Sequence, residues 1–536
     1  MAWDRARSLE RIKKLMASVP TVTAIDLSKD LYQTMLNEMR DGRRSRINLK
    51  ESFQSIPRDR AILVDGVHVY ARLANYDEYR LEGNHETEQG HKRGLNFLHL
   101  HYAASDRIIE DFGAIRIDYH GGRMHCVVAE PVDDEYARVA KAIELAKRLI
   151  EFSAIVSRDV ASGDYLAKMI IGIDTGKCVA IRSGSGHDQD PLFLGDAANK
   201  AAKMAENVGE GIFLSNRARQ IIGIANALNE NFSDSLNLET RLQVSTNART
   251  RKPELGGVFD DGDATYASLL KEWRADIEGF KRYTAGQSAF VFHQHTPPLK
   301  TIDFGNLSPG NSIRMELVSI FGDVAGYTAY IENAMQTGRV GEAVRAIHVI
   351  RGELHNVLKD DFSSRKVRYI GDCIHGLLAV GQPNAIDTQM SVIEAVQCAA
   401  AMRSSFNLIK QMLALNTLGL AIGVETGITP VSRIGRRGDD SVRVASSSAT
   451  IISETEQSDA DGTQLAIGQA AYDALPLYMR NAFQDRKADG LDCDVYDVIF
   501  GGAPAVVSHT DEPARAHGSS AEEPYRQPAR AHSVIG

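Results

Sequence analysis

Residues 315–335 read MELVSIFGDVAGYTAYIENAM, and this stretch decides the fold. Its apolar first part has the composition of a buried strand that Asp323 interrupts, and the residues after it have the spacing of a helix. Residues 60–75, RAILVDGVHVYARLAN, repeat the pattern, with Asp65 taken as the counterpart of Asp323 at an offset of 258. An apolar strand with one carboxylate, followed by helical material, therefore occurs twice.

Two further segments repeat at nearly the same distance. Residues 115–130 and 367–380 each predict two short strands around a tight turn, where Gly122 corresponds to Asp372 at an offset of 250. Residues 170–181 match residues 420–434 at an offset of 251. Three matched segments predict two copies of one unit in which strands alternate with helices, an α/β sandwich.

The repeat divides the chain into five segments. The N-terminal segment is predicted to be a helical packing or dimerisation element, and the C-terminal segment, rich in Ala, Pro, Ser and charge, to be disordered. The predicted limits are 1–54 for the helical N-terminal segment, 55–275 for the first domain, 276–309 for a linker, 310–500 for the second domain and 501–536 for the tail.

Composition excludes several classes of protein. The 536 residues carry a net charge of -9 without long blocks of one sign, which gives no electrostatic case for binding nucleic acid or a membrane. No run of 18 apolar residues and no apolar signal core occur, so we expect a cytoplasmic protein. The five cysteines are scattered, which predicts neither a zinc site nor a disulfide framework.

Asp323 and Asp372 are candidate metal ligands. Each lies in or beside an apolar strand, and two carboxylates on neighbouring strands are hard oxygen ligands of the kind that a pair of Mg²⁺ or Mn²⁺ ions requires. The alternative is that Asp323 caps the following helix and Asp372 fills a turn, since Asp favours both positions.

SIFGDVAGYT (319–328) and RYIGDCIHG (368–376) together resemble the two metal-binding segments of the class III nucleotidyl cyclases, the adenylate and guanylate cyclase family. The resemblance implies two tandem domains with mostly antiparallel sheets, flanking helices and an active site between paired domains. One domain supplies two aspartates for two Mn²⁺ or Mg²⁺ ions, and the other supplies an Asn and a basic residue. LGDAANKAAKMAE (194–206) resembles that helix motif, which implies catalytic roles for Asn199 and Lys203, although the family usually has Arg at the second position.

The two copies are complementary under this resemblance. The first copy has Gly122 in place of the second metal aspartate. The second copy has DSVRVASSSATI (440–451) at the helix segment, which puts Arg443 where Asn is expected. Pairing the copies therefore predicts one competent site, with Asn199 and Lys203 facing Asp323 and Asp372. It also predicts a degenerate site that holds Asp65 and Arg443, structural or regulatory in role.

Base recognition in the family involves positions that correspond to Asp118 and Leu192 of the first copy. An ionised Asp118 would accept the imino N–H of uracil or guanine, and would face the acceptor nitrogen of adenine unfavourably. The expected order of substrates is UTP or GTP, then CTP, then ATP. The alternative is that Asp118 is an ordinary surface residue beside a strand.

RYIGD (368–372), VDGVHVYARL (64–73) and the two-copy layout are similar to the pyrimidine cyclases of the bacterial Pycsar anti-phage systems. This similarity implies a nucleoside triphosphate substrate, UTP before CTP, and a cyclic product read by a separate effector protein. A guanylate or adenylate cyclase and a catalytically dead nucleotide-binding module stay open as alternatives. Homodimerisation also stays open, and Arg251 and Lys252 are candidates for binding the triphosphate.

Overall fold

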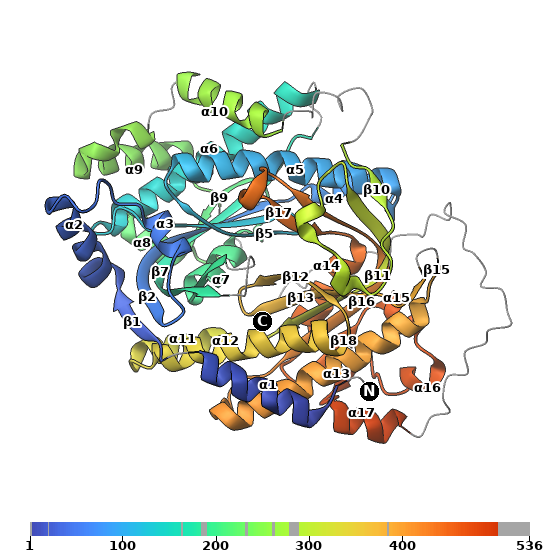
Figure 1. The fold of residues 1–536 in the computed structure, drawn as a ribbon. Helices are drawn as coiled ribbons and strands as arrows, with labels where there is room; N and C mark the ends of the chain where they lie inside the picture. The colour runs from blue at the N-terminus through green and yellow to red at the C-terminus, as the bar shows by residue number, and fades with distance from the viewer. Residues whose placement is uncertain are drawn as a thin grey trace.

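Two mixed α/β halves with sheets of corresponding strand order make up the molecule in the computed structural model (Figure 1). The structure describes residues 3–19, 21–161, 165–183, 190–230, 234–259, 263–277, 289–382 and 385–501. The first sheet has the order β5-β6-β2-β7-β8, and the second has the order β12-β13-β11-β16-β18-β19. Most strand pairs are antiparallel and helices flank the sheets, which confirms the predicted fold class.

The first half contains the strands β1 (Thr23–Asp26), β2 (Arg60–Leu73), β5 (Ile115–His120), β6 (Arg123–Val128), β7 (Met169–Ser183), β8 (Asp190–Leu194) and β9 (Gly211–Leu214). Its principal helices are α2 (Tyr32–Arg40), α3 (Leu49–Gln54), α4 (Tyr76–Arg80), α5 (Glu88–Asp111), α6 (Glu135–Ala161), α7 (Asp196–Met204), α9 (Leu238–Arg251) and α10 (Asp263–Asp276). The buried face of α5 and α6 supplies much of this half's core.

The second half contains the strands β10 (Phe292–His293), β11 (Ser312–Asp323), β12 (Arg365–Ile370), β13 (Cys373–Leu378), β16 (Ala421–Ile434), β17 (Val442–Ala445), β18 (Gln464–Ile467) and β19 (Lys487–Asp489). Its principal helices are α11 (Tyr327–Gln336), α12 (Val340–Asn356), α13 (Thr388–Leu413), α14 (Ser448–Ser458), α16 (Leu477–Arg480) and α17 (Cys493–Phe500). In the described residues, no helix combines the length and the hydropathy that a membrane span requires.

The two halves exchange apolar side chains across their interface. Leu192 and Leu194 of β8 belong to the core cluster of the second half. Reciprocally, Val442 and Val444 of β17 belong to the core cluster of the first half. Burial of apolar surface from both sides favours one fixed arrangement, so the two copies pair within a single chain.

Strand register corrects the internal repeat. Gly66 on β2 lies opposite Gly176 on β7, and Leu317 on β11 lies opposite Gly427 on β16. Since Gly176 and Gly427 are matched in sequence, the counterpart of Gly66 is Leu317, at an offset of 251. The predicted offset of 258 for this strand was therefore wrong by seven residues, because an apolar run does not mark its own register.

Arg72, not Asp65, is the counterpart of Asp323 in this register. Asp65 lies seven residues earlier on β2, where its side chain is exposed and its Oδ2 accepts a hydrogen bond from Nη2 of Arg138 at 2.8 Å. The expectation that Asp65 stands at a second metal position is corrected by this placement.

The N-terminal segment joins both halves. Helix α1 (Arg5–Ser18) packs against α12 and α13 of the second half, whereas β1 pairs in parallel with β2 of the first (Figure 1). The prediction of a helical segment was thus incomplete, since residues 23–26 extend a sheet. Part of the predicted linker is also ordered into the second half, where β10 pairs with β11 and Leu299 and Phe304 are buried.

Arg11 of α1 is expected to be a major contributor to this connection. Its guanidinium contacts the carboxylates of Glu353 at 2.7 Å and Asp361 at 2.8 Å, and both carboxylates are almost fully buried. Arg11→Ala should lower the free energy of unfolding by about 3–5 kcal/mol, since it leaves two buried negative charges with less compensation. Urea unfolding measures the change. Arg7→Ala, which removes a half-exposed partner of Asp361, should cost about 1 kcal/mol or less, and equal losses would contradict the argument.

The domain limits themselves stay a prediction, and residues 502–536 of the predicted tail lie outside the described residues.

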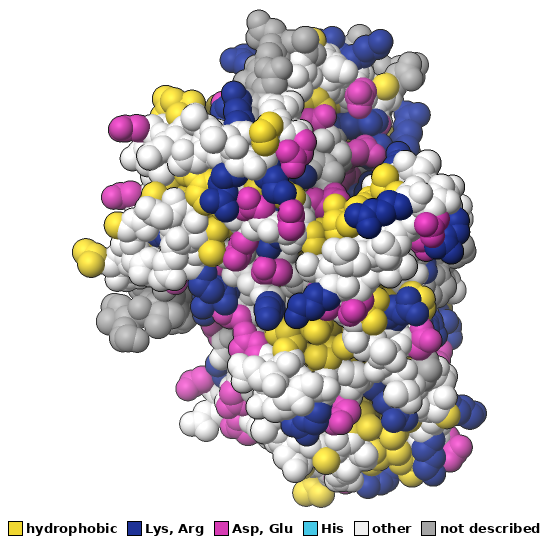
Figure 2. Space-filling model, turned by 90° about the vertical axis from the view of Figure 1, so that its left-hand side faces the viewer, with side chains coloured by type: hydrophobic (Ala, Val, Ile, Leu, Met, Phe, Trp, Pro, Cys, Tyr) yellow, Lys and Arg dark blue, Asp and Glu magenta, His cyan; other side chains and the backbone are white. Residues whose placement is uncertain are grey.

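The face of the molecule shown in Figure 2 carries Lys and Arg side chains interspersed with Asp and Glu. This mixture agrees with the absence of long single-sign blocks in the sequence.

Candidate active site

A cavity of about 590 Å³ lies between the two halves and is lined by both. The first half contributes Asp118 on β5, Leu192 on β8 and Asn199 on α7. The second half contributes Asp323 at the end of β11 and Asp372 beside it. Five residues predicted to act together thus line one cavity, although they come from four strands or turns and one helix.

Asp323 and Asp372 are positioned by adjacent strands. Asp323 is the last residue of β11, and Asp372 lies in the two-residue turn that joins β12 to β13, where Gly371 has a φ of 58°. Strand β13 pairs directly with β11, with Ile374 opposite Gly322. The turn and the strand end therefore bring the two carboxylates to the same edge of the sheet.

The two carboxylates interact unfavourably in the protein alone. Burial raises the pKa of Asp323 to about 6, although the N–H of Val324 donates to its carboxylate and opposes this shift. Burial, followed by the negative charge of Asp323, raises the pKa of Asp372 well above its ordinary value. Neither carboxylate forms an ion pair with a Lys or Arg side chain in the described part of the chain. The charge of Arg351 acts on Asp372 and lowers its pKa, but burial and the charge of Asp323 outweigh it. A pair of partly desolvated oxygen donors fits a hard divalent cation.

Among the described residues, this pair is not part of a cluster of three or more His, Cys, Asp or Glu side chains.

Asn199 bridges the cavity. It is exposed on the first turns of α7, and its Nδ2 donates a hydrogen bond to Oγ1 of Thr328 on α11 at 2.8 Å. Lys203 follows one turn later, with an exposed side chain that is not part of the cavity lining. It forms no ion pair with another described residue. The structure thus brings Asn199 to the aspartates, whereas Lys203 lies outside the cavity lining.

Asp118 is engaged in an ion pair that the sequence did not reveal. Its Oδ1 accepts from Nη1 of Arg368 at 3.0 Å, and its Oδ2 lies 3.0 Å from Nδ1 of His120. Burial would raise the pKa of Asp118, but the charges of Arg368 and His120 hold that pKa well below its ordinary value. Asp118 is therefore an ionised acceptor at the cavity wall. Asp118 and Arg368 occupy corresponding positions in the two copies, at an offset of 250. This correspondence is the sequence signal that could have suggested the ion pair.

The ion pairs continue across the interface. Nε2 of His120 lies 3.4 Å from Oε1 of Glu454 on α14, and Nη1 of Arg123 donates to the same oxygen at 2.8 Å. Burial opposes ionisation of Glu454, but Arg123 and His120 outweigh it and lower the pKa of Glu454 to about 2. Asp118, His120 and Glu454 thus form a charged bridge between the halves.

This charged bridge is expected to make stability depend on pH. Burial lowers the pKa of His120, but the carboxylates of Asp118 and Glu454 raise it above the ordinary 6.5 overall. Arg123, Arg368 and His375 also act on these two carboxylates. Since protonated His120 is favoured in the fold, its stabilisation is complete below pH 6.5 and declines as pH rises through the folded pKa.

His120→Gln removes this titration. The difference in unfolding free energy between wild type and His120→Gln should shrink between about pH 6 and about pH 9, as measured by urea unfolding at each pH. A difference that stays constant over that range would show that the fold does not raise the pKa of His120.

The predicted degenerate site is not assembled. A Cβ on Gly172 would lie 2.0 Å from the carbonyl oxygen of Ala201, and one on Gly423 would lie 2.0 Å from that of Ser453. These equivalent contacts match α7 with α14, so the counterparts of Asn199 and Lys203 are residues 451 and 455.

Those counterparts are Ile451 and Thr455. Arg443 instead lies on β17, opposite Arg433 on β16, and the alignment that placed it at the helix position was wrong. Neither Arg443 nor Asp65 lines the cavity.

The suggested triphosphate ligands are also placed elsewhere. Nε of Arg251 contacts Oδ2 of Asp134 at 3.2 Å, and Nζ of Lys252 contacts Oδ2 of Asp133 at 2.8 Å. Neither basic residue lines the cavity between the halves.

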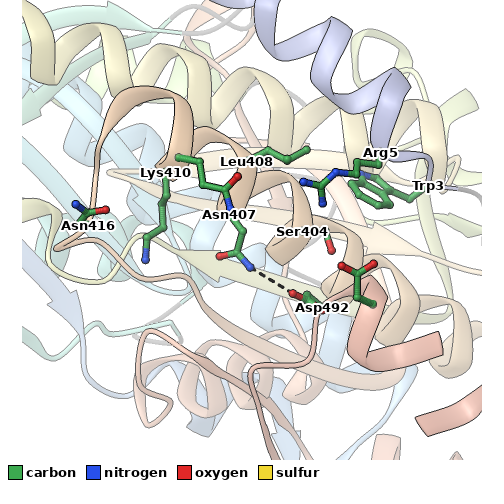
Figure 3. Close-up of a pocket in the computed structure, with 10 residues that line it drawn as sticks. Trp3, Arg5, Ser404, Asn407, Leu408, Lys410, Asn416 and Asp492 are labelled. Carbon is green, nitrogen blue, oxygen red and sulfur yellow. Dashed lines mark hydrogen bonds between the residues drawn. The ribbon is translucent and has the colours of Figure 1, made fainter. Parts of the chain in front are cut away.

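A smaller pocket of about 260 Å³ lies on the second half between α1, α13 and the start of α17 (Figure 3). Trp3 and Arg5 approach it from α1 and the residues before it, and Asn407 donates to Asp492 at 3.5 Å. The pocket contains none of the predicted site residues.

Comparison with known proteins gives full-length relatives. The chain is 41% identical to a uridylate cyclase of a Rhizobium species, over 97% of this chain and 100% of the relative. It is 36% identical to a uridylate cyclase of Pseudomonas aeruginosa, over 92% of this chain and 90% of the relative. No family model matches the sequence.

A solved structure has the same fold over nearly the whole chain. It is the crystal structure of a class III adenylyl cyclase-like ATP-binding protein from Pseudomonas aeruginosa, with a TM-score of 0.79 and 34% sequence identity. The match covers 93% of this chain and 99% of that one.

Proposed function

This chain belongs to the class III nucleotidyl cyclases, in the group of the uridylate cyclases, and we propose that it converts UTP to 3′,5′-cyclic UMP and pyrophosphate. The observation that carries the proposal is the cavity between the halves, which Asp323, Asp372, Asn199 and Asp118 all line. In the reaction, the ribose 3′ oxygen attacks the α-phosphorus, the bond to the β-phosphate oxygen breaks, and the 3′ hydroxyl loses its proton.

Asp323 and Asp372 would hold two Mn²⁺ or Mg²⁺ ions in this proposal. When bound, such ions lower the pKa of a coordinated hydroxyl and neutralise charge on the phosphates. The two aspartates would hold the ions at the edge of the second sheet that faces the first half. Their mutual repulsion, which adds to the effect of burial on the pKa of Asp372, supports a cation as the partner that would relieve it.

Asn199 would orient the ribose and donate a hydrogen bond where charge develops at phosphorus. Its amide already points across the cavity toward Thr328, which supports this role. Lys203, one turn further along α7, would supply a positive charge to the phosphates as a point charge. Because its side chain is exposed, it can change rotamer without breaking an ion pair to a described residue.

Uracil recognition would rest on Asp118 together with the apolar side chain of Leu192. Uracil presents an imino N–H between two carbonyl oxygens. The ionised Asp118 would accept from the N–H, and Arg368, which donates to its Oδ1, would keep it ionised. Leu192 would pack against the base and exclude water.

Asp118→Asn tests this assignment. The variant loses the ionised acceptor, so kcat/KM for UTP should fall by about 10- to 100-fold, the effect of losing one hydrogen bond to a charged group. Steady-state rates with UTP and CTP measure the change. Asp41→Asn, an exposed residue outside the cavity, is the matched control. An unchanged ratio of UTP to CTP rates would refute base reading by Asp118.

The activity is tested by incubating the purified chain with each of the four ribonucleoside triphosphates and Mn²⁺, with products resolved by mass spectrometry. Cyclic UMP as the main product supports the proposal. Cyclic CMP would place the chain among cytidylate-forming enzymes, and cyclic GMP or cyclic AMP would overturn the base assignment. No product from any triphosphate would favour a catalytically dead nucleotide-binding module.

The physiological setting is part of the proposal. As in the Pycsar-like systems that the sequence resembles, cyclic UMP would act in the cytoplasm as a second messenger of anti-phage defence. A separate effector protein would read it. A homodimer is compatible with this setting, although both sets of catalytic residues come from one chain.

A further inference from the structure

We call the sheet edge that carries Asp323 and Asp372 the metal edge. The positions that correspond to these two aspartates in the first half carry different residues. Arg72 is the register counterpart of Asp323, and Gly122 is the counterpart of Asp372. Arg72 and Asp323 both line the cavity between the halves. Where one end of the cavity carries two carboxylates, the other end therefore carries a guanidinium and no carboxylate from these two positions.

The Arg72 guanidinium makes no direct ion pair with another described residue. Its Nε donates to the carbonyl oxygen of Ala205 at 2.9 Å. Burial, and then the positive charge of Arg123, lowers the pKa of Arg72, although the charges of Glu206 and Asp77 oppose this shift. A lowered pKa means that the protein environment disfavours this charge, so an anion that reaches the guanidinium would be stabilised.

Two further hydrogen-bond donors lie near Arg72. Arg123 lies opposite Arg72 in the pairing of β2 with β6, Tyr70 lies two residues earlier on β2, and both line the cavity. Two carboxylates also face it. Glu454 is paired with Arg123 and His120, whereas Glu206 is exposed at the cavity edge. We define Arg72, Arg123 and Tyr70 as the arginine subsite.

We propose that the arginine subsite binds a phosphate-bearing anion directly, without a metal ion. Guanidinium groups match the geometry of phosphate oxygens, and their hydrogen bonds to phosphate are charge-assisted. The subsite would bind without catalysis, because Ile451 and Thr455 stand at the positions of Asn199 and Lys203. This proposal goes beyond the cyclase activity and does not require turnover.

Two sources of phosphate chemistry are distinguishable. Inorganic pyrophosphate is the leaving group of the proposed reaction, and cyclic UMP is its nucleotide product. Isothermal titration of the full chain with each probe, in EDTA and low salt, measures binding without metal or turnover. Saturable binding of a probe that Arg72→Gln weakens supports the proposal and identifies the source. Absence of binding with both probes would overturn it.

Matched variants locate the binding. Arg72→Gln should weaken binding of the effective probe by about 10- to 100-fold. Arg60→Gln, at the exposed opposite end of β2, should leave it within about twofold. Arg72→Lys keeps the charge and should bind with intermediate affinity, which provides a second measurement if Arg72→Gln does not fold.

Two results would refute the location. Unchanged binding in Arg72→Gln would exclude the subsite, and an equal loss in Arg60→Gln would show that the effect follows net charge and not this subsite. Because all titrations are done in EDTA, a chain that fails to cyclise UTP with Mn²⁺ still gives a decisive result here.

Discussion

Asp372→Asn is expected to lower kcat for UTP cyclisation by about 10³-fold or more. The substitution removes one of the two aspartates at the metal edge, and metal-assisted charge stabilisation contributes several kcal/mol to such reactions. The side chain keeps its size, so the cavity should keep its shape. Product formation with Mn²⁺ measures the loss, and Asp323→Asn should behave in the same way.

Thermal unfolding separates this result from misfolding. Removing one of two mutually repelling buried carboxylates should leave the melting temperature unchanged or raise it, because Asp323 and Asp372 destabilise each other when no cation is bound. Asp65→Asn is the matched control, since Asp65 lies outside the cavity and contacts Arg138. Equal loss of turnover in Asp65→Asn would contradict the single metal edge.

Asn199→Ala should lower kcat for UTP by about 10²- to 10³-fold, the cost of losing one oriented donor in the transition state. KM should change much less, because the donor acts chiefly when charge develops at phosphorus. Steady-state kinetics with saturating Mn²⁺ measure both values.

Thr328→Val is the control for a merely structural role of Asn199. It removes the hydrogen bond that links Asn199 to α11 but leaves the amide in the cavity. The variant should retain kcat within about fivefold, on the scale of one neutral hydrogen bond. If both variants lose the same activity, the bond between the halves matters and catalysis by Asn199 does not.

Most residues of the candidate site could be predicted from local sequence. Asp323 ends an apolar strand, Asp372 sits in a tight turn and Asn199 lies near the start of a short helix, and each of these settings is encoded by neighbouring residues. The prediction that the two copies bring these residues together also followed from local motifs, because each copy lacks the part that the other retains.

Register and long-range charge pairs did not follow from local sequence. Asp65 was aligned with Asp323 because a strand of Val, Ile and Ala looks similar at several offsets, and only the pairing with β7 fixes Arg72 as the counterpart. The bond between Asp118 and Arg368 joins residues 250 positions apart. No periodicity within either strand predicts such a partner.

The sequence by itself determined the α/β class, the duplication and the chemical character of the metal edge, because turns, strand ends and helix starts depend on residues close along the chain. Only the tertiary structure decided that the halves pair within one chain, that α1 and β1 join them, and that Arg72 faces the cavity opposite the aspartates. These features depend on how apolar faces and charges from distant segments are buried together, and that burial is decided by the whole chain.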